Sequence, residues 1–222
     1  MPNRSSTFFR RNGLSLVLLF IMLLAWGGQA LTGWCEKNNE LQEHGDHVLT
    51  FGAYLGSHHF WSATGENWES EFLQMGLYVL LTIRLRQLGS SESKQLEGKE
   101  EVDRTPRSRP DAPWPVRKGG WYLKVYQHSL SIAFIVLFLL SFLVHLNNSC
   151  AEYNAERVEK GRTVVTTAGF LGSSRFWFES FQNWQSEFLA VLSIVFLSIH
   201  LRQKGSPESK PVDASHEHTG TS

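Results

Sequence analysis

The sequence has few cysteines and no net charge, and both features exclude classes of protein. Two cysteines, Cys35 and Cys150, are too few for a disulfide scaffold or for a zinc site built from thiolates alone. The 21 basic residues balance the 21 acidic ones, which gives no support for nucleic-acid binding. The sequence also lacks a glycine-rich phosphate loop, a nucleophile and base at recognisable spacing, and a metal-binding motif. We therefore expect neither an enzyme nor a bound cofactor.

Proline is scarce outside one segment. Four of the seven prolines lie between residues 106 and 115. Because proline lacks a backbone N–H and disfavours helix interiors, residues 95–121 are expected to form an extended, polar linker with charges of both signs. The linker divides the chain into two regions, residues 13–94 and 122–210.

Charge is absent from long runs of the sequence. No charged residue occurs between Gly13 and Trp34, so this run meets the requirement of about 20 residues for a membrane-spanning helix. A second uncharged run begins at Ser129, and two further helices, residues 60–85 and 176–201, begin polar and end apolar. We therefore predict an all-α membrane protein with four transmembrane helices, which span about residues 13–34, 66–86, 128–149 and 182–202.

A sequence repeat relates the two regions. Asn-Trp-Glu-Ser-Glu-Phe-Leu (residues 67–73) returns 116 positions later as Asn-Trp-Gln-Ser-Glu-Phe-Leu, and 33 of the 83 residues from position 12 onward are identical at this offset. The chain is therefore predicted to hold two tandem, parallel repeats of one helical hairpin. The first span also fits a cleaved signal peptide, since Gly28-Gln29-Ala30 resembles a cleavage site. Its counterpart in the second repeat is internal, which favours a retained span.

Basic residues are distributed unevenly among the polar segments. Residues 1–12, 84–124 and 202–222 hold 3, 10 and 3 lysines or arginines, whereas the loops at 35–58 and 151–175 hold 1 and 4. Since basic residues accumulate on the cytoplasmic side, residues 1–12, the linker and the C-terminus are expected there. Residues 211–222 are polar without periodicity and are predicted to be a disordered tail.

Two motifs carry a resemblance to a known family. Asn-Trp-x-Ser-Glu-Phe-Leu, followed by a span and by Leu-Arg-Gln-Lys-Gly-Ser-Pro-Glu-Ser-Lys (residues 201–210), resembles a family of uncharacterised bacterial integral membrane proteins. The resemblance covers most of residues 8–211 and implies a multi-pass protein of the bacterial inner membrane, with no established activity. The first repeat departs from the second motif, since Leu88 and Ser91 replace its lysine and its proline.

The repeated motif also supplies a candidate polar site. If the arginines that follow the second span mark the cytoplasmic boundary, Glu71 lies about 20 Å above it, where a carboxylate is costly unless it is paired. Asn67 lies four residues before Glu71, on the same helix face. The alternative is that the glutamates cap a bent backbone or reach the outer headgroup layer. We expect lysine at Glu71 or Glu187 to impair assembly more than lysine at Glu69. The candidate site is Asn67, Ser70, Glu71, Asn183, Ser186 and Glu187.

Aromatic residues and cysteines mark the outer ends of the spans. The tryptophans at the starts of the polar-to-apolar helices are expected at the membrane–water interface; they are Trp61, Trp68, Trp177 and Trp184. Cys35 and Cys150 occupy adjacent repeat positions at similar predicted height, which allows a disulfide between them. In the alternative, each cysteine is a small apolar residue that faces its own helical neighbours.

Three classes of function are compatible with these features. The first is a non-catalytic interaction, assembly or envelope component, whose partners are the lipid bilayer and either another membrane protein or a second copy. The second is a small channel or transporter that uses the paired Asn/Glu positions. The third is a haem or redox subunit, for which His128 and His200 share the cytoplasmic end. His145 lies near the outer end of the third span and is expected to make interfacial hydrogen bonds.

Overall fold

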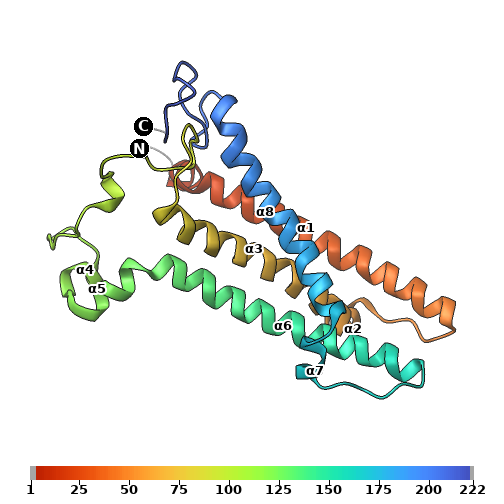
Figure 1. Cartoon of the computed structure of the whole chain (residues 1–222). Coiled ribbons are helices and arrows are strands. Elements are labelled where there is room, and N and C mark those ends of the chain that lie inside the picture. The colour runs from red at the N-terminus through yellow and green to blue at the C-terminus, as the bar shows by residue number, and fades with distance from the viewer. Residues whose placement is uncertain (1–3, 221–222) are drawn as a thin grey trace. The chain divides into compact units, whose positions relative to one another are not determined.

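The computed structural model describes residues 4–220, with side chains from Phe8 onward, and this part of the chain is helical without strands. The all-helical fold is therefore confirmed. In chain order the helices are α1 (Arg4–His44), α2 (Phe51–Leu55), α3 (His58–Arg84), α4 (Trp114–Lys118), α5 (Gly120–Gln127), α6 (Ser129–Glu159), α7 (Thr167–Leu171) and α8 (Ser174–His200), with a 3₁₀ turn at Glu101–Asp103 (Figure 1).

The chain forms two compact units, Met1–Ala63 and Thr64–Ser222, whose boundary lies within α3. The first unit holds α1, α2 and the start of α3, and the second holds the rest of α3 and α4 to α8. Within the described residues, two helices are long and apolar enough to cross a membrane, one in each unit. They are residues 8–44 of α1 and the whole of α6.

In the first unit, side-chain hydrogen bonds organise the turn between α1 and α3. The Asn38 amide donates to the backbone oxygen of Leu49 at 3.0 Å, and its oxygen accepts from the Leu49 N–H at 2.7 Å. Thr50 caps α2 and Ser57 caps the start of α3, because their hydroxyl oxygens accept from free backbone N–H groups. Buried Tyr54 and neighbouring aromatic side chains pack beneath this turn.

The second unit contains the same arrangement between α6 and α8. Asn154 makes the two-way bond with the backbone of Val165, at 2.9 and 2.8 Å. Thr166 caps α7 and Ser173 caps α8, and Phe170 takes the place of the buried tyrosine. Each of these residues lies 116 positions after its counterpart, and α7 and α8 begin and end 116 positions after α2 and α3. The two halves therefore share residues that form helix caps and turns.

The second repeated motif ends the helices α3 and α8. The Arg86 side chain folds back and donates to the backbone oxygens of Thr82, Ile83 and Leu85, and Arg202 makes the equivalent three bonds at the end of α8. The carbonyls at a helix end have no partner within the helix, so a folded-back arginine satisfies them. A glycine follows in each copy, and both have a positive φ, 83° at Gly89 and 87° at Gly205. This conformation turns the chain away from the helix.

The helices extend further than the predicted spans. α1 continues to His44 and α6 to Glu159, where the sequence predicts loops from about residue 35 and residue 151. Ion pairs along the helix surface, such as Lys37 with Glu40 at 2.8 Å, support these polar extensions. The linker likewise contains α4, although prolines argue against helix there. Pro115 lies in the first turn of α4, where the missing N–H is not needed.

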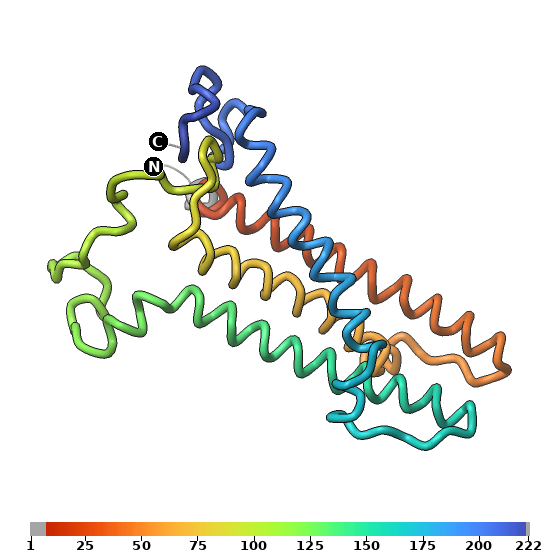
Figure 2. The backbone as a smooth tube through the Cα atoms, in the orientation of Figure 1, coloured from red at the N-terminus to blue at the C-terminus, as the bar shows by residue number. Residues whose placement is uncertain are grey.

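The C-terminal segment is folded in the structure, whereas the sequence predicts disorder from residue 211. Buried Lys210 donates to the backbone oxygens of Ser215, His216 and His218 at 3.3, 3.0 and 2.8 Å. The Gly89 N–H donates to Thr219 Oγ1 at 2.9 Å, so the segment lies against the loop that follows α3 (Figure 2). Residues 221–222 of the predicted tail lie outside the described part of the chain.

Candidate functional site

The candidate site lies in the second unit, where α3, α6 and α8 meet. Gly65 on α3 allows the close approach, because a Cβ atom there would lie 2.7 Å from the backbone nitrogen of His145 on α6. The Phe176 ring from α8 stacks on the His145 ring, with centroids 4.9 Å apart. His145 is therefore enclosed by all three helices and has no exposed surface.

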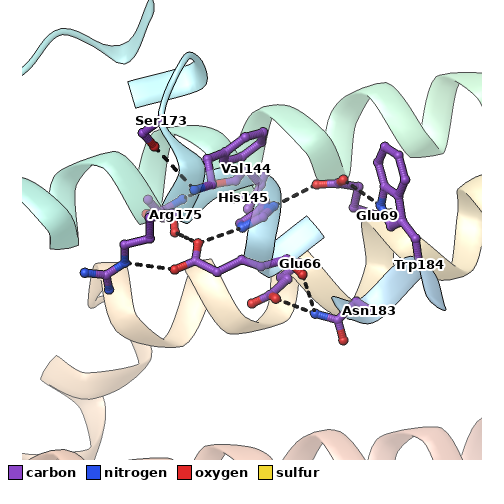
Figure 3. Close-up of polar contacts among 12 residues, drawn as sticks. Glu66, Glu69, Val144, His145, Ser173, Arg175, Asn183 and Trp184 are labelled. Carbon is purple, nitrogen blue, oxygen red and sulfur yellow. Dashed lines mark hydrogen bonds and ion pairs between the residues drawn. The ribbon is translucent and has the colours of Figure 1, made fainter. Parts of the chain in front are cut away.

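Two carboxylates flank the ring of His145 (Figure 3). Nδ1 lies 2.7 Å from Oε2 of Glu69, which is also fully buried. Nε2 lies 3.6 Å from Oε2 of Glu179, a distance within ion-pair range but too long for a hydrogen bond. Because carboxylates only accept hydrogen bonds, this geometry suits an imidazolium ring that presents an N–H on both sides.

Glu179 connects the buried His145 ring to more exposed polar residues on α6 and α8. Its carboxylate accepts from Ser149 Oγ at 2.8 Å and from Arg175 Nε at 3.0 Å, and Arg175 also bonds Glu156 at 2.8 Å. Burial alone would raise the pKa of Glu179, but the nearby His145 ring and the hydrogen bonds from Arg175 and Ser149 together lower it. A lowered carboxyl pKa stabilises the fold above the ordinary glutamate pKa. This stabilisation is lost as the pH falls through the lowered value.

The recurring motif contributes to the other side of the cluster. The second carboxylate oxygen of Glu69 accepts a hydrogen bond from the Trp184 indole at 3.0 Å. The Asn183 amide donates to Glu66 on α3. The charged partner of Asn183 is therefore Glu66, whereas the sequence pairs Asn183 with Glu187.

The burial of the acidic residues in the repeated motif differs from the prediction. Glu71 is exposed and Glu69 is fully buried, which is the reverse of the burial expected when Glu69 was chosen as the tolerant position. The helix turns by about 100° per residue, and residue 69 therefore faces α6 while residue 71 does not. The hydroxyls of Ser70 and Ser186 both bond to carbonyls of their own helix, at 2.8 Å.

The predicted interfacial tryptophans have several environments. Trp177 donates to the Leu171 oxygen at 2.8 Å, and Trp184 donates to Glu69, so both indole N–H groups are used inside the second unit. Trp61 packs against Trp26 in the first unit, and Trp68 is 37% exposed. Trp68 is therefore the residue of the predicted set with the most surface available to an interface.

Cys35 and Cys150 are free cysteines, so the structure contains no disulfide between them. Cys150 is buried among Phe170, Phe176 and other apolar residues of its own unit, and the Asn154 amide lies 3.7 Å from its sulfur. Cys35 is exposed on α1. This agrees with the alternative in which Cys150 packs as a small apolar residue.

Comparison of the two repeats does not reveal this cluster, because four of its charged residues, His145, Glu179, Glu66 and Glu69, are not repeated. The sequence signal that identifies the cluster is a charged residue in one repeat opposite a neutral residue in the other. At an offset of 116, His145 corresponds to Gln29, Glu179 to Ala63, Glu66 to Gln182 and Glu69 to Gln185.

The cluster of His145, Glu69 and Glu179 places opposite charges side by side and connects three helices. Among the described residues, no group of three or more His, Cys, Asp or Glu side chains is arranged to hold a metal ion. Both ring nitrogens of His145 face carboxylates, and Glu69 is occupied on both oxygens. The arrangement can bind a proton and can tie three helices together by charge-assisted contacts.

Comparison with known proteins identifies one family. Residues 5–221 match the model of a domain of unknown function (DUF6766). No curated protein and no solved structure matches the chain.

Proposed function

The chain belongs to this family, DUF6766, and from that premise we propose that it is a non-catalytic, four-span protein of the bacterial inner membrane that acts in interaction or assembly. In this proposal both termini and the linker lie in the cytoplasm. The two hairpins, α1 to α3 and α6 to α8, are parallel tandem repeats, an arrangement supported by their matching caps and turns.

Exposed apolar side chains on α3 and α8 carry this proposal. α1 and α6 already have the length and apolar composition of membrane-spanning helices. A large exposed apolar surface on a helix marks a site that lipid or another protein covers. Large apolar residues are exposed in the C-terminal halves of the other two long helices as well, at Leu77, Leu80, Leu81 and Ile83 of α3 and at Leu189, Leu192, Ile194, Phe196 and Leu197 of α8.

The internal pairing of the cluster supports an assembly role. Within a bilayer, apolar side chains gain little by leaving lipid, so packing and interhelical polar contacts contribute strongly to helix association. The bonds of His145, Glu69 and Glu179 join α3, α6 and α8 in this way. Two hollows of the described chain, of about 850 and 340 Å³, are lined by the linker, Leu88 and residues near the C-terminus, and by none of these three residues.

Reporter fusions test the four-span arrangement. Fusions at Gly98 and at the C-terminus are expected to report cytoplasm, and a fusion at Asp46 is expected to report the outside, because the basic residues lie mainly in the linker and at the termini. Paired alkaline phosphatase and fluorescent protein fusions measure the two compartments independently. An outside location for Gly98 would overturn the two-hairpin topology.

The approach of α3 and α8 beside Glu71 and Glu187 favours a second candidate function, a small channel or transporter. These residues come from equivalent positions of the two repeats. The Gln74 amide from α3 donates to the Glu187 backbone oxygen at 3.2 Å, so the two helices are joined beside the pair. Two neighbouring carboxyl groups at a helix contact can hold a proton or a cation between them.

Flux measurements distinguish the two candidates. If the chain transports protons or cations through this pair, wild-type protein in liposomes should carry a flux that Glu71→Gln/Glu187→Gln abolishes, since the double variant removes both charges and keeps the side-chain size. Glu97→Gln, on the linker, is the matched control. Equal ion flux for wild type, both variants and empty liposomes would exclude transport and favour the interaction role.

A further inference from the structure

The short helices α4 and α5, which precede α6, expose most of their aromatic side chains. Trp114 is 53% exposed and Trp121 is 66% exposed, with Tyr122 and Tyr126 at 40% and 44%. In a helical segment of 14 residues, so much aromatic surface is unusual without a partner that covers it. The segment leads through His128 into α6, whose first turns also expose apolar side chains.

Positive charge lies among these aromatic residues. Arg117, Lys118 and Lys124 are all exposed, and no acidic residue occurs from Ala112 to Ala151. The Lys118 ammonium group lies 5.8 Å from the Trp114 ring centroid and 5.5 Å from that of Tyr122. These cation–π contacts keep a positive charge beside the two exposed rings.

A glycine corner brings the two helices together. Gly119 and Gly120 have positive φ angles of 70° and 58°, which let α4 and α5 meet without a connecting loop. The contacts of Lys118 then bridge from Trp114 on α4 to Tyr122 on α5. The aromatic and basic side chains therefore form one folded surface, which we term the α4–α5 hairpin (residues 114–127).

We propose that the α4–α5 hairpin binds the anionic headgroups of phospholipids in the cytoplasmic leaflet. The proposal rests on the four-span topology, which places this segment on the cytoplasmic side. Tryptophan and tyrosine rings favour the level of the headgroups because they have an apolar body and a polar edge. Basic residues beside a span are attracted by the negative charge of the leaflet.

The position of the hairpin favours a membrane over a soluble acidic partner. Tyr126 is separated by two residues from Ser129, where the apolar helix α6 begins, so a bilayer that surrounds α6 reaches the hairpin directly. The linker arginines, Arg104, Arg107 and Arg109, carry an equal charge without nearby aromatic side chains in the sequence. They provide a comparison of equal formal charge, in which Arg104 is paired with Glu101.

Lipid titration tests the proposal. Full-length protein in detergent is titrated with phosphatidylglycerol and, separately, with phosphatidylcholine, and native mass spectrometry gives an apparent Kd for each lipid. Wild type is expected to bind phosphatidylglycerol more tightly. The variant Arg117→Gln/Lys118→Gln/Lys124→Gln should weaken this binding roughly fivefold for each charge removed, with little change for phosphatidylcholine.

The control variant Arg104→Gln/Arg107→Gln/Arg109→Gln loses the same charge and should keep the wild-type Kd. Equal Kd values for the two lipids in wild type, or equal losses in both triple variants, would overturn the assignment. If the hairpin variant fails to fold, as judged by circular dichroism, Arg117→Gln/Lys124→Gln retains the Lys118 contacts and is measured in its place. The Gly98 reporter is read on the same variants, so an error in topology is recognised separately from an absence of lipid preference.

Discussion

Glu69→Ala is expected to lower the free energy of unfolding by about 3–5 kcal/mol, because it leaves His145 buried without its nearest counter-charge. Glu69 and His145 are both fully buried and lie 2.7 Å apart. The substitution also removes the acceptor of the Trp184 indole N–H. Unfolding in mixed micelles, followed by circular dichroism, measures the loss.

The matched control is Glu71→Ala, which removes an exposed carboxylate two residues along the same helix. It should change the free energy of unfolding by no more than about 0.5 kcal/mol. The double variant Glu69→Ala/His145→Ala should lose less than the sum of the two single losses, because the second substitution removes the charge that the first leaves unpaired. Equal losses for the two glutamates would contradict the burial of Glu69.

Gly65→Ala is expected to destabilise the second unit by about 1–3 kcal/mol, since the added Cβ meets the backbone of a neighbouring helix. The Cβ would lie 2.7 Å from the backbone nitrogen and 3.0 Å from the Cα atom of His145. Backbone atoms cannot move aside as a flexible side chain can, so α3 and α6 would have to separate. Weaker hydrogen bonding between Glu69 and His145 should accompany the loss, and infrared spectroscopy of the carboxyl groups detects it.

The same substitution at Gly27 provides the control. Gly27 lies inside α1, and a Cβ there meets no atom within 4 Å. Alanine is the better helix former, so Gly27→Ala should raise the free energy of unfolding by up to about 1 kcal/mol. The two alanine substitutions are therefore expected to have opposite signs. Stabilisation by both would show that α3 and α6 do not approach closely at Gly65.

The two halves of the chain share the residues that shape turns and differ in those that carry buried charge. Asn154 and Thr166 make the same bonds as their counterparts Asn38 and Thr50. His145 and Glu69, by contrast, have glutamine at the equivalent positions of the other repeat, Gln29 and Gln185. The charged cluster of the second unit therefore depends on residues that differ between the repeats, whereas the turns depend on residues that the repeats share.

The sequence by itself determined the helical class, the internal repeat and the approximate positions of α3 and α8. The polar-to-apolar pattern predicts helices at residues 60–85 and 176–201, and the structure has them at His58–Arg84 and Ser174–His200. Such features depend on local hydrophobic patterning and capping, which neighbouring residues in the chain largely control. The equivalence of positions 71 and 187 also follows from the repeat.

Only the tertiary structure decided which charged side chains are buried together. Glu69 and Glu71 are two residues apart and alike in composition, yet their burial differs because only one faces α6. The partner of Glu69, His145, lies 76 positions away, and the approach of the two helices depends on the missing side chain of Gly65. Contacts between distant segments depend on how helices pack, and a pattern read along one chain does not contain that information.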